Sequence, residues 1–90
     1  MNSQVIYFVN LCQRYLDGQL CTNDYILAFE KLYIAAEDTL SEKEFVVFDD
    51  IYMTNDRFEP NGKMRKADTY LIDEVELQRL IQKGVNTLVV

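Results

Sequence analysis

Four segments of this 90-residue chain repeat apolar side chains at intervals of three and four residues, and no segment alternates apolar with polar side chains. The first spacing lines one face of a helix, whereas alternation would indicate a strand. The segments cover residues 3–17, 23–37, 41–56 and 73–83. Because short or moderate connections join them, neighbouring helices are expected to run antiparallel. The pattern predicts an all-α fold, an antiparallel four-helix bundle, in a single domain that covers residues 1–90. The side chains expected to face inward are Val5, Phe8, Val9, Cys12, Leu16, Ile26, Phe29, Leu32, Tyr33, Ala36, Phe45, Phe48, Ile51, Tyr52, Ile72, Leu77, Leu80 and Ile81. In the first two segments these inward faces are expected to be widened by Ile6, Tyr7, Leu11, Tyr15, Tyr25, Leu27 and Ile34.

Capping residues mark the ends of the first three predicted helices. Asp17-Gly18 is expected to end the first helix, since glycine adopts the left-handed conformation at low cost, and Thr22 is expected to cap the second. Ser41 and Glu44 form a capping box, in which each side chain accepts a hydrogen bond from the other residue's main-chain amide. The segment 45–48, Phe-Val-Val-Phe, would fit a strand by itself. The capping box and the length of the periodic segment favour a helix.

The last predicted helix follows a polar connection. Residues 60–70 are expected to form a loop, in which Asn61-Gly62 predicts a turn and Lys63, Arg65 and Lys66 form a basic patch. Asp73 then caps the helix, and Glu76 is placed to complete a second capping box. Lys83-Gly84 is expected to end this helix. The apolar tail 85–90 leaves three arrangements open: it extends the helix, lies across the core, or frays.

The acidic composition narrows the classes of function. Asp and Glu number 15 against 9 Lys and Arg, for a formal net charge of −6. Phosphate groups would repel such a chain, so neither nucleic acid nor an acidic membrane is an expected partner, and a cationic partner is favoured. The chain has no histidine, the commonest general base and zinc ligand, and its three glycines form no phosphate-binding loop. The carboxylates from Asp49 to Glu59 match no EF-hand spacing. We therefore expect no enzyme, no metal site and no cofactor.

The two cysteines and the N-terminal residues bear on the compartment. Cys12 falls on an apolar helical stripe and is expected to be a buried, reduced thiol, although a disulfide with Cys21 remains open. The N-terminus lacks the basic region and cleavage site of a secretory signal. No apolar run approaches the roughly 18 residues that a membrane span needs. We expect a cytoplasmic protein that does not bind membranes.

The third predicted helix has two different faces. A projection at about 100° per residue puts Phe48, Ile51 and Tyr52 on the inward side. One interpretation of the remaining arc is a solvated face with two stray apolar residues. The other is an acidic stripe with apolar inserts, as an interface with a basic partner requires. The arc contains Val46, Asp49, Asp50, Met53 and Asp56.

The segment 55–60, Asn-Asp-Arg-Phe-Glu-Pro, follows that helix and extends the stripe; we call it the acidic knuckle. In a purely structural interpretation Phe58 packs into the core, Arg57 caps the helix, and Pro60 prevents the helix from continuing. In a functional interpretation the segment presents its carboxylates to a basic partner. Arg57 is expected to act internally, and its predicted ion-pair partners are Glu59, Asp68 and Asp73.

The knuckle Asp56-Arg57-Phe58-Glu59-Pro60, a polar loop, Tyr70, an acidic helix start and a last helix with Val75 resemble the colicin D immunity protein family. The resemblance runs from about Phe8 to Lys83. It implies an antiparallel four-helix bundle that is a non-enzymatic inhibitor. The implied partner is a ribonuclease toxin that cleaves tRNA in the anticodon loop. Acidic groups in that family imitate tRNA phosphates and plug the basic active site of the toxin, in a complex expected to be one to one.

The resemblance also implies which residues face the toxin. Asp56 and Glu59 carry over directly, with Asp49 and Asp50 upstream. Asn61 stands where the colicin member has an aspartate, and the basic patch follows it. These departures indicate a diverged partner, such as the C-terminal toxin of a contact-dependent growth inhibition system. The predicted toxin-binding residues are Asp49, Asp50, Met53, Asp56, Glu59 and Asn61.

Two alternatives from other classes remain. A helical adaptor would dimerise through the apolar tail 87–90. A mimic of DNA would block a DNA-binding protein with the same carboxylates.

Overall fold

Helices make up the regular structure of the chain, and the all-helical class is confirmed. The computed structural model describes residues 3–88, and within them no strand is present apart from an isolated parallel β-bridge between Phe58 and Ile72. The elements in order are α1 (Ser3–Leu16), α2 (Thr22–Ala36), the 3₁₀-helix η1 (Glu37–Thr39), α3 (Glu42–Asp56), α4 (Gly62–Ala67) and α5 (Glu74–Leu88).

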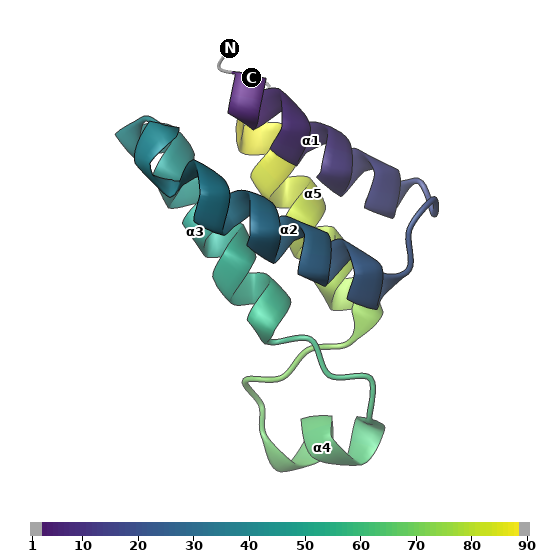
Figure 1. Ribbon diagram of the computed structural model, residues 1–90. Coiled ribbons are helices and arrows are strands. Elements are labelled where there is room, and N and C mark those ends of the chain that lie inside the picture. The colour runs from purple at the N-terminus through teal and green to yellow at the C-terminus, as the bar shows by residue number, and fades with distance from the viewer. Residues whose placement is uncertain (1–2, 89–90) are drawn as a thin grey trace.

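The long helices α1, α2, α3 and α5 pack into a helical bundle around one hydrophobic core (Figure 1). α1 packs against α2, α2 against α3, α3 against α5, and α5 against α1. The short helix α4 stands beyond one end of this bundle, between two extended segments that connect it to α3 and α5 (Figure 1). This arrangement places α3 between α2 and α5, so that both long sides of α3 form seams with a neighbour.

Aromatic rings fill the centre of the bundle. Phe8 of α1 stacks on Phe48 of α3, with ring centroids 4.3 Å apart, and Phe29 of α2 packs against both rings. Tyr15 and Tyr25 stack at 4.4 Å near the α1–α2 turn. Ring pairs of this kind stabilise a core by about 0.5–1.5 kcal/mol each beyond the area they bury. Of the predicted inward positions, these are buried: Val5, Phe8, Cys12, Phe29, Tyr33, Ala36, Phe48, Ile51, Ile72, Leu77 and Ile81. The other predicted inward positions are half-buried and pack against this core: Val9, Leu16, Ile26, Leu32, Phe45, Tyr52 and Leu80.

Several apolar residues that were expected to widen the inward faces lie outside. Leu27 and Ile34 on α2 are 58% and 64% exposed, and Ile6 and Tyr7 on α1 are exposed as well. The prediction for these positions is wrong because α2 packs mainly against α1 and α3 among the long helices, and its outer face is left exposed.

Two of the predicted helix boundaries are observed, and one helix start differs from its prediction. Gly18 follows α1 with a φ of 81°, in the left-handed region where glycine is favoured. The capping box before α3 is confirmed: the Glu44 amide donates to Ser41 Oγ over 3.2 Å, and the Ser41 amide donates to Glu44 Oε1 over 2.9 Å. α2 already begins at Thr22, whose hydroxyl shares a 2.8 Å hydrogen bond with that of Tyr15. Thr22 therefore ties α2 to α1 instead of flanking the helix as a cap.

The segment 60–70 is not the continuous loop that was predicted, because it contains α4. The Asn61 side chain caps this helix by accepting hydrogen bonds from the amides of Lys63, over 2.9 Å, and Met64, over 3.4 Å. Asn61-Gly62 thus starts a helix, because an asparagine side chain satisfies amides at a helix start as readily as in a turn.

The predicted end of the last helix at Lys83-Gly84 is also wrong, since α5 continues to Leu88. Gly84 lies against α3: a Cβ atom built on it would lie 2.9 Å from Cδ1 of Ile51. The glycine therefore serves a close helix–helix approach and not a helix end. Of the three arrangements left open for the tail, residues 85–88 extend the helix, and residues 89 and 90 lie outside the described residues.

Candidate functional site

The acidic knuckle is held in place by main-chain hydrogen bonds to the segment that precedes α5. The amide of Glu59 donates to the carbonyl of Ile72 over 3.0 Å, and the amide of Ile72 donates to the carbonyl of Arg57 over 2.9 Å. Phe58, half-buried, packs against the core, as its structural interpretation predicted. Two chain segments that are remote in sequence thus fix the direction in which the knuckle leaves α3.

Arg57 acts internally, but not through the predicted ion pairs. It occupies the C-cap position of α3. Its Nε donates to the carbonyl of Tyr70 over 2.8 Å, and its guanidinium carbon lies 5.1 Å from the centre of the Tyr70 ring. None of the expected carboxylates Glu59, Asp68 and Asp73 forms a salt bridge with it in the described structure. A carbonyl and an aromatic face satisfy this cation, so it leaves the nearby carboxylates unpaired.

The six predicted site residues differ in whether the side chain already has a partner within the protein. Asp49 Oδ1 accepts a 2.6 Å hydrogen bond from Tyr33, Glu59 Oε1 accepts a 3.3 Å bond from the amide of Asn61, and Asn61 caps α4. These three side chains have structural tasks. The carboxylates of Asp50 and Asp56 are exposed, and within residues 3–88 neither has a hydrogen-bond or ion-pair partner. Met53, the sixth residue, is 55% exposed.

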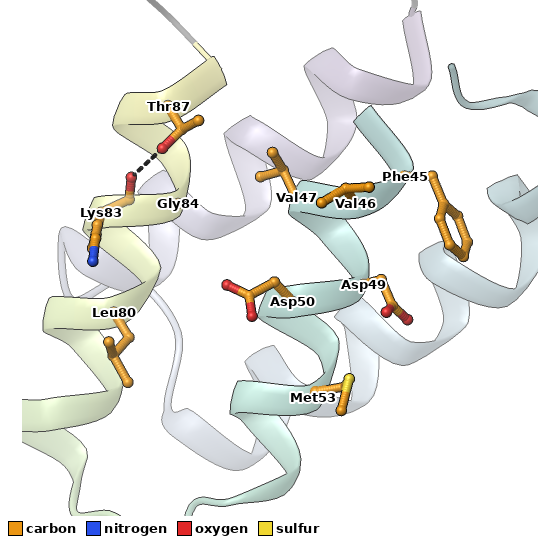
Figure 2. A pocket seen from close by; sticks show the side chains of 10 residues that line it. All are labelled: Phe45, Val46, Val47, Asp49, Asp50, Met53, Leu80, Lys83, Gly84 and Thr87. Carbon is orange, nitrogen blue, oxygen red and sulfur yellow. Dashed lines mark hydrogen bonds between the residues drawn. The ribbon is translucent and has the colours of Figure 1, made fainter. Parts of the chain in front are cut away.

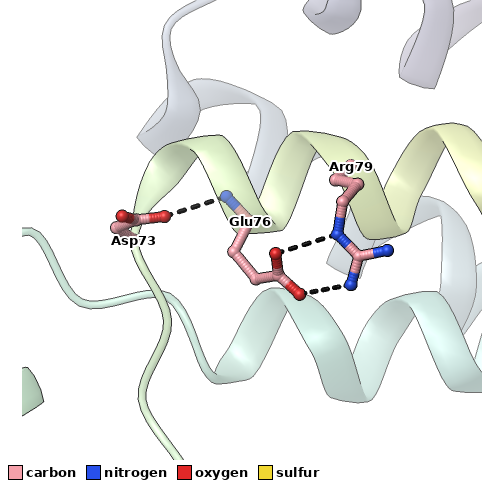
Figure 3. Close-up of polar contacts among 3 residues, drawn as sticks. All are labelled: Asp73, Glu76 and Arg79. Carbon is pink, nitrogen blue, oxygen red and sulfur yellow. Dashed lines mark hydrogen bonds and ion pairs between the residues drawn. The ribbon is translucent and has the colours of Figure 1, made fainter.

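The ion pair found among the described residues lies away from this set, on α5 (Figure 3). Asp73 caps that helix by accepting from the Glu76 amide over 2.8 Å, as predicted. Glu76, however, pairs with Arg79 through two hydrogen bonds, so the second capping box is not formed. These bonds from Arg79 hold the pKa of Glu76 below its ordinary value. A bidentate guanidinium is a stronger partner for the carboxylate than one main-chain amide.

A groove of about 430 Å³ runs along the seam between α3 and α5 (Figure 2). Val46, Asp50 and Met53 line it from α3, at spacings of four and three residues that place them on one face. Figure 2 shows the Asp50 carboxylate turned toward α5 and the Asp49 carboxylate turned away from it. The full lining is Phe45, Val46, Val47, Asp49, Asp50, Met53, Leu80, Lys83, Gly84 and Thr87.

Four of the five residues of the predicted stripe, Val46, Asp49, Asp50 and Met53, thus line one wall of a hollow, which the sequence pattern of α3 alone did not indicate. Asp56, the fifth, lies instead at the pocket between α2 and α3. The second wall comes from α5, and the close approach of that helix depends on Gly84. Lys83 stands on this second wall, and sequence reasoning did not assign it to the site. Its place beside a glycine in the last periodic segment was the available signal, but it was interpreted as a helix end.

A second feature that sequence reasoning missed is the buried Asn55, which is 4% exposed. Its Oδ1 accepts a 3.1 Å hydrogen bond from the Tyr25 hydroxyl, whereas its Nδ2 has no partner among the described residues. Asn55 lies at a small pocket of about 90 Å³ between α2 and α3, together with Glu30 and Asp56. Its position four residues after the inward-facing Ile51 is the signal that places it inside the bundle.

Comparisons with known proteins identify no relative. No family model matches the chain, and neither a curated protein nor a solved structure matches it. Among residues 3–88, no helix combines the length and the apolar character that crossing a lipid bilayer requires. The functional argument therefore depends on the groove, the two unpaired carboxylates and the knuckle.

Proposed function

We propose that this protein is an immunity protein of the colicin D immunity type, an antiparallel four-helix bundle that binds and neutralises a tRNA-cleaving bacterial toxin. It acts in the cytoplasm as the inhibitor in a one-to-one complex with the toxin. Its carboxylates occupy the basic active site of the toxin in place of tRNA phosphates. The resemblance of Asp56-Arg57-Phe58-Glu59-Pro60 to that family supports the partner class.

The observation that carries the proposal is that Asp50 and Asp56 are exposed and are not neutralised by the chain's own cations. Arg57, the cation closest in sequence to Asp56, is engaged by Tyr70. Unpaired carboxylates on a rigid helix need no reorganisation before they bind a cationic surface. Such charges accelerate encounter with an oppositely charged partner and penalise partners of the wrong charge.

Growth protection tests the proposal directly. Cells that express the toxin encoded next to this gene should survive with the unchanged protein, and the variant Asp50→Ala/Asp56→Ala/Glu59→Ala should lose protection. Each desolvated charge that is removed should cost about 2–5 kcal/mol of binding free energy, or roughly 30-fold to several thousand-fold in Kd. Asp38→Ala is the matched control, since Asp38 is an exposed carboxylate in η1, which precedes α3, whereas the knuckle follows α3.

Two results would contradict the proposal. One is full protection by the triple variant when circular dichroism shows a normal helix content. The other is competition for the toxin by duplex DNA but not by tRNA, which would instead favour the DNA-mimic alternative. Sedimentation of the protein alone separates the proposal from the adaptor alternative. An immunity protein of this type should be a monomer before it binds the toxin, whereas the adaptor should be a dimer.

A further inference from the structure

We propose that the α3–α5 groove is an anchor site for one large apolar side chain that stands beside a lysine or arginine on the partner protein. The identity of that partner as a toxin rests on the proposed function. The chemistry of the site itself does not, because it follows from the residues that line the groove. The anchor would lie on the side of α3 that faces α5, separate from the knuckle.

The apolar part of the proposal comes from exposed side chains around a hollow. Val46 is 61% exposed and Met53 is 55% exposed, and both line the groove together with Leu80 from the opposite wall. A volume of about 430 Å³ lies within the usual range for sites that take small organic groups, roughly 300–1,000 Å³. Aromatic side chains that fill such pockets, each burying about 150–250 Å², commonly dominate the energetics of protein interfaces.

The cationic part comes from Asp50. It lies between Val46 and Met53 on the same face of α3, and its unpaired carboxylate turns toward α5 (Figure 2). The neighbouring Asp49 is already bonded to Tyr33. One free carboxylate next to an apolar hollow selects a ligand that carries one cation next to one apolar group.

Lys83 on the opposite wall restricts this selection further. It lines the same groove, and it forms no salt bridge within the described part of the chain. Its ammonium group repels a second cation, so the groove disfavours a uniformly basic segment. Removing the charge of Lys83 should strengthen the binding of a cationic ligand. A surface that carries carboxylates alone would show no such effect.

Glycine amide resonances provide the test. The chain has three glycines: Gly84 lines the groove, while Gly18 follows α1 and Gly62 starts α4. In ¹⁵N-labelled protein titrated with N-acetyl-Phe-Arg-amide, the Gly84 amide should shift saturably, whereas the amides of Gly18 and Gly62 should not. The analogues N-acetyl-Phe-citrulline-amide, which lacks the charge, and N-acetyl-Ala-Arg-amide, which lacks the ring, should each bind about tenfold more weakly or worse.

Three variants assign the effect to residues. Asp50→Asn should abolish the preference for arginine over citrulline, Lys83→Gln should tighten the binding of the arginine peptide, and Asp38→Asn should change neither. The inference is overturned if Gly84 does not respond, or if citrulline and arginine peptides bind equally well. It is also overturned if Gly84 shifts with protein concentration alone, since the groove would then hold a second copy of this chain.

The outcome is separable from that of the proposed function. Peptide binding that depends on Asp50, together with full growth protection by Met53→Ala/Asp50→Asn, would confirm the anchor chemistry but contradict its use by the toxin. Failure of peptide binding, together with loss of protection in Asp56→Ala/Glu59→Ala, which changes the knuckle and leaves Asp50 in place, would leave the immunity function standing and remove the anchor site.

Discussion

The Tyr33 hydroxyl donates a 2.6 Å hydrogen bond to Asp49 Oδ1 and so links α2 to α3 at the edge of the acidic stripe. The Tyr33 ring also stacks on that of Tyr52, with centroids 4.5 Å apart and planes 1° from parallel. Two adjacent carboxylates thus have different tasks: Asp49 stabilises the α2–α3 seam, and Asp50 remains free at the groove.

Tyr33→Phe keeps the ring stack and removes the hydrogen bond. We expect it to lower the free energy of unfolding by about 1–2 kcal/mol, because the acceptor is a carboxylate in a partly buried position. Asp50→Asn should change stability by less than about 0.5 kcal/mol, since it removes no contact. Urea unfolding followed by circular dichroism measures both. If both variants lowered the free energy of unfolding equally, the structural task assigned to Asp49 and the absence of one at Asp50 would be contradicted.

Gly84→Ala should destabilise the protein even though alanine favours a helix by about 1 kcal/mol over glycine. The new Cβ would lie 2.9 Å from Cδ1 of Ile51, and Ile51 is only 2% exposed and cannot easily move aside. Overpacking of this kind costs about 1–3 kcal/mol. Ile51→Val removes that Cδ1 atom but keeps Cγ1, which would lie 3.0 Å from the new Cβ. The clash is therefore relieved in part, and the double variant should be more stable than the sum of the single effects implies. Strict additivity in thermal unfolding would argue against the close approach of α5 to α3.

Asn55→Ala should destabilise the fold by about 1–3 kcal/mol, because the buried Tyr25 hydroxyl loses its acceptor. Tyr25→Phe should also lower the stability, because neither Oδ1 nor Nδ2 of the buried Asn55 side chain would then have a hydrogen-bond partner. Removing both polar groups in Tyr25→Phe/Asn55→Leu should cost less than the two single changes together. A double-mutant cycle from urea unfolding tests this coupling, and zero coupling energy would contradict it.

Stability should fall at alkaline pH because of Cys12. Burial raises the pKa of the Cys12 thiol from an ordinary 9.0 to about 12. Between those values the unfolded chain has lost a proton that the native state keeps, so the stabilising contribution is complete below about pH 9 and declines as pH rises toward 12. Burial also raises the pKa of Tyr25, which acts in the same direction. Urea midpoints against pH should show a smaller alkaline decline for Cys12→Ala than for the unchanged protein.

Thiol counting provides the companion measurement. Neither cysteine forms a disulfide among the described residues. Cys12 is buried, as the sequence predicted, and Cys21 is exposed. A thiol-specific disulfide reagent at neutral pH should therefore modify Cys21 at once and Cys12 only after unfolding, whereas rapid modification of both in the native protein would contradict the burial of Cys12.

Asn61 should influence function through α4 and not through direct contact. Asn61→Ala removes the cap and should cost about 1 kcal/mol of local stability, whereas Asn61→Asp and Asn61→Ser retain a capping oxygen. Amide hydrogen exchange of residues 63–67 should speed up in the alanine variant alone. If toxin neutralisation follows the same order, the residue acts as a cap; if aspartate and serine fail as alanine does, Asn61 contacts the partner.

The local signals in this chain were reliable at two helix boundaries, whereas the predicted box of Asp73 and Glu76 is only half formed, because Arg79 binds the Glu76 carboxylate. The box of Ser41 and Glu44 and the left-handed Gly18 are formed as predicted, because each depends only on groups within four residues. Asn61 shows the limit of such signals, since the same side chain can close a turn or start a helix. The next residues, 62–67, adopt a helical conformation, and this makes Asn61 the cap of α4.

The sites depended on contacts that no single segment contains. Gly84 marks a helix end by its local chemistry, yet Ile51 on another helix gives it a different role. Arg57 was expected to find a carboxylate and instead binds the Tyr70 carbonyl, which becomes available only when the Phe58–Ile72 bridge aligns the two segments. Asp49 and Asp50 are chemically identical, and only the position of Tyr33 separates them.

Apolar spacing and capping chemistry were therefore sufficient to specify an all-helical chain and an acidic face on α3, since both arise from interactions between residues close in sequence. Which carboxylates stay free, and whether that face borders a hollow, was decided by how α2 and α5 pack against α3. Those contacts join residues that are distant along the chain, and the side-chain pattern of one helix contains no record of them.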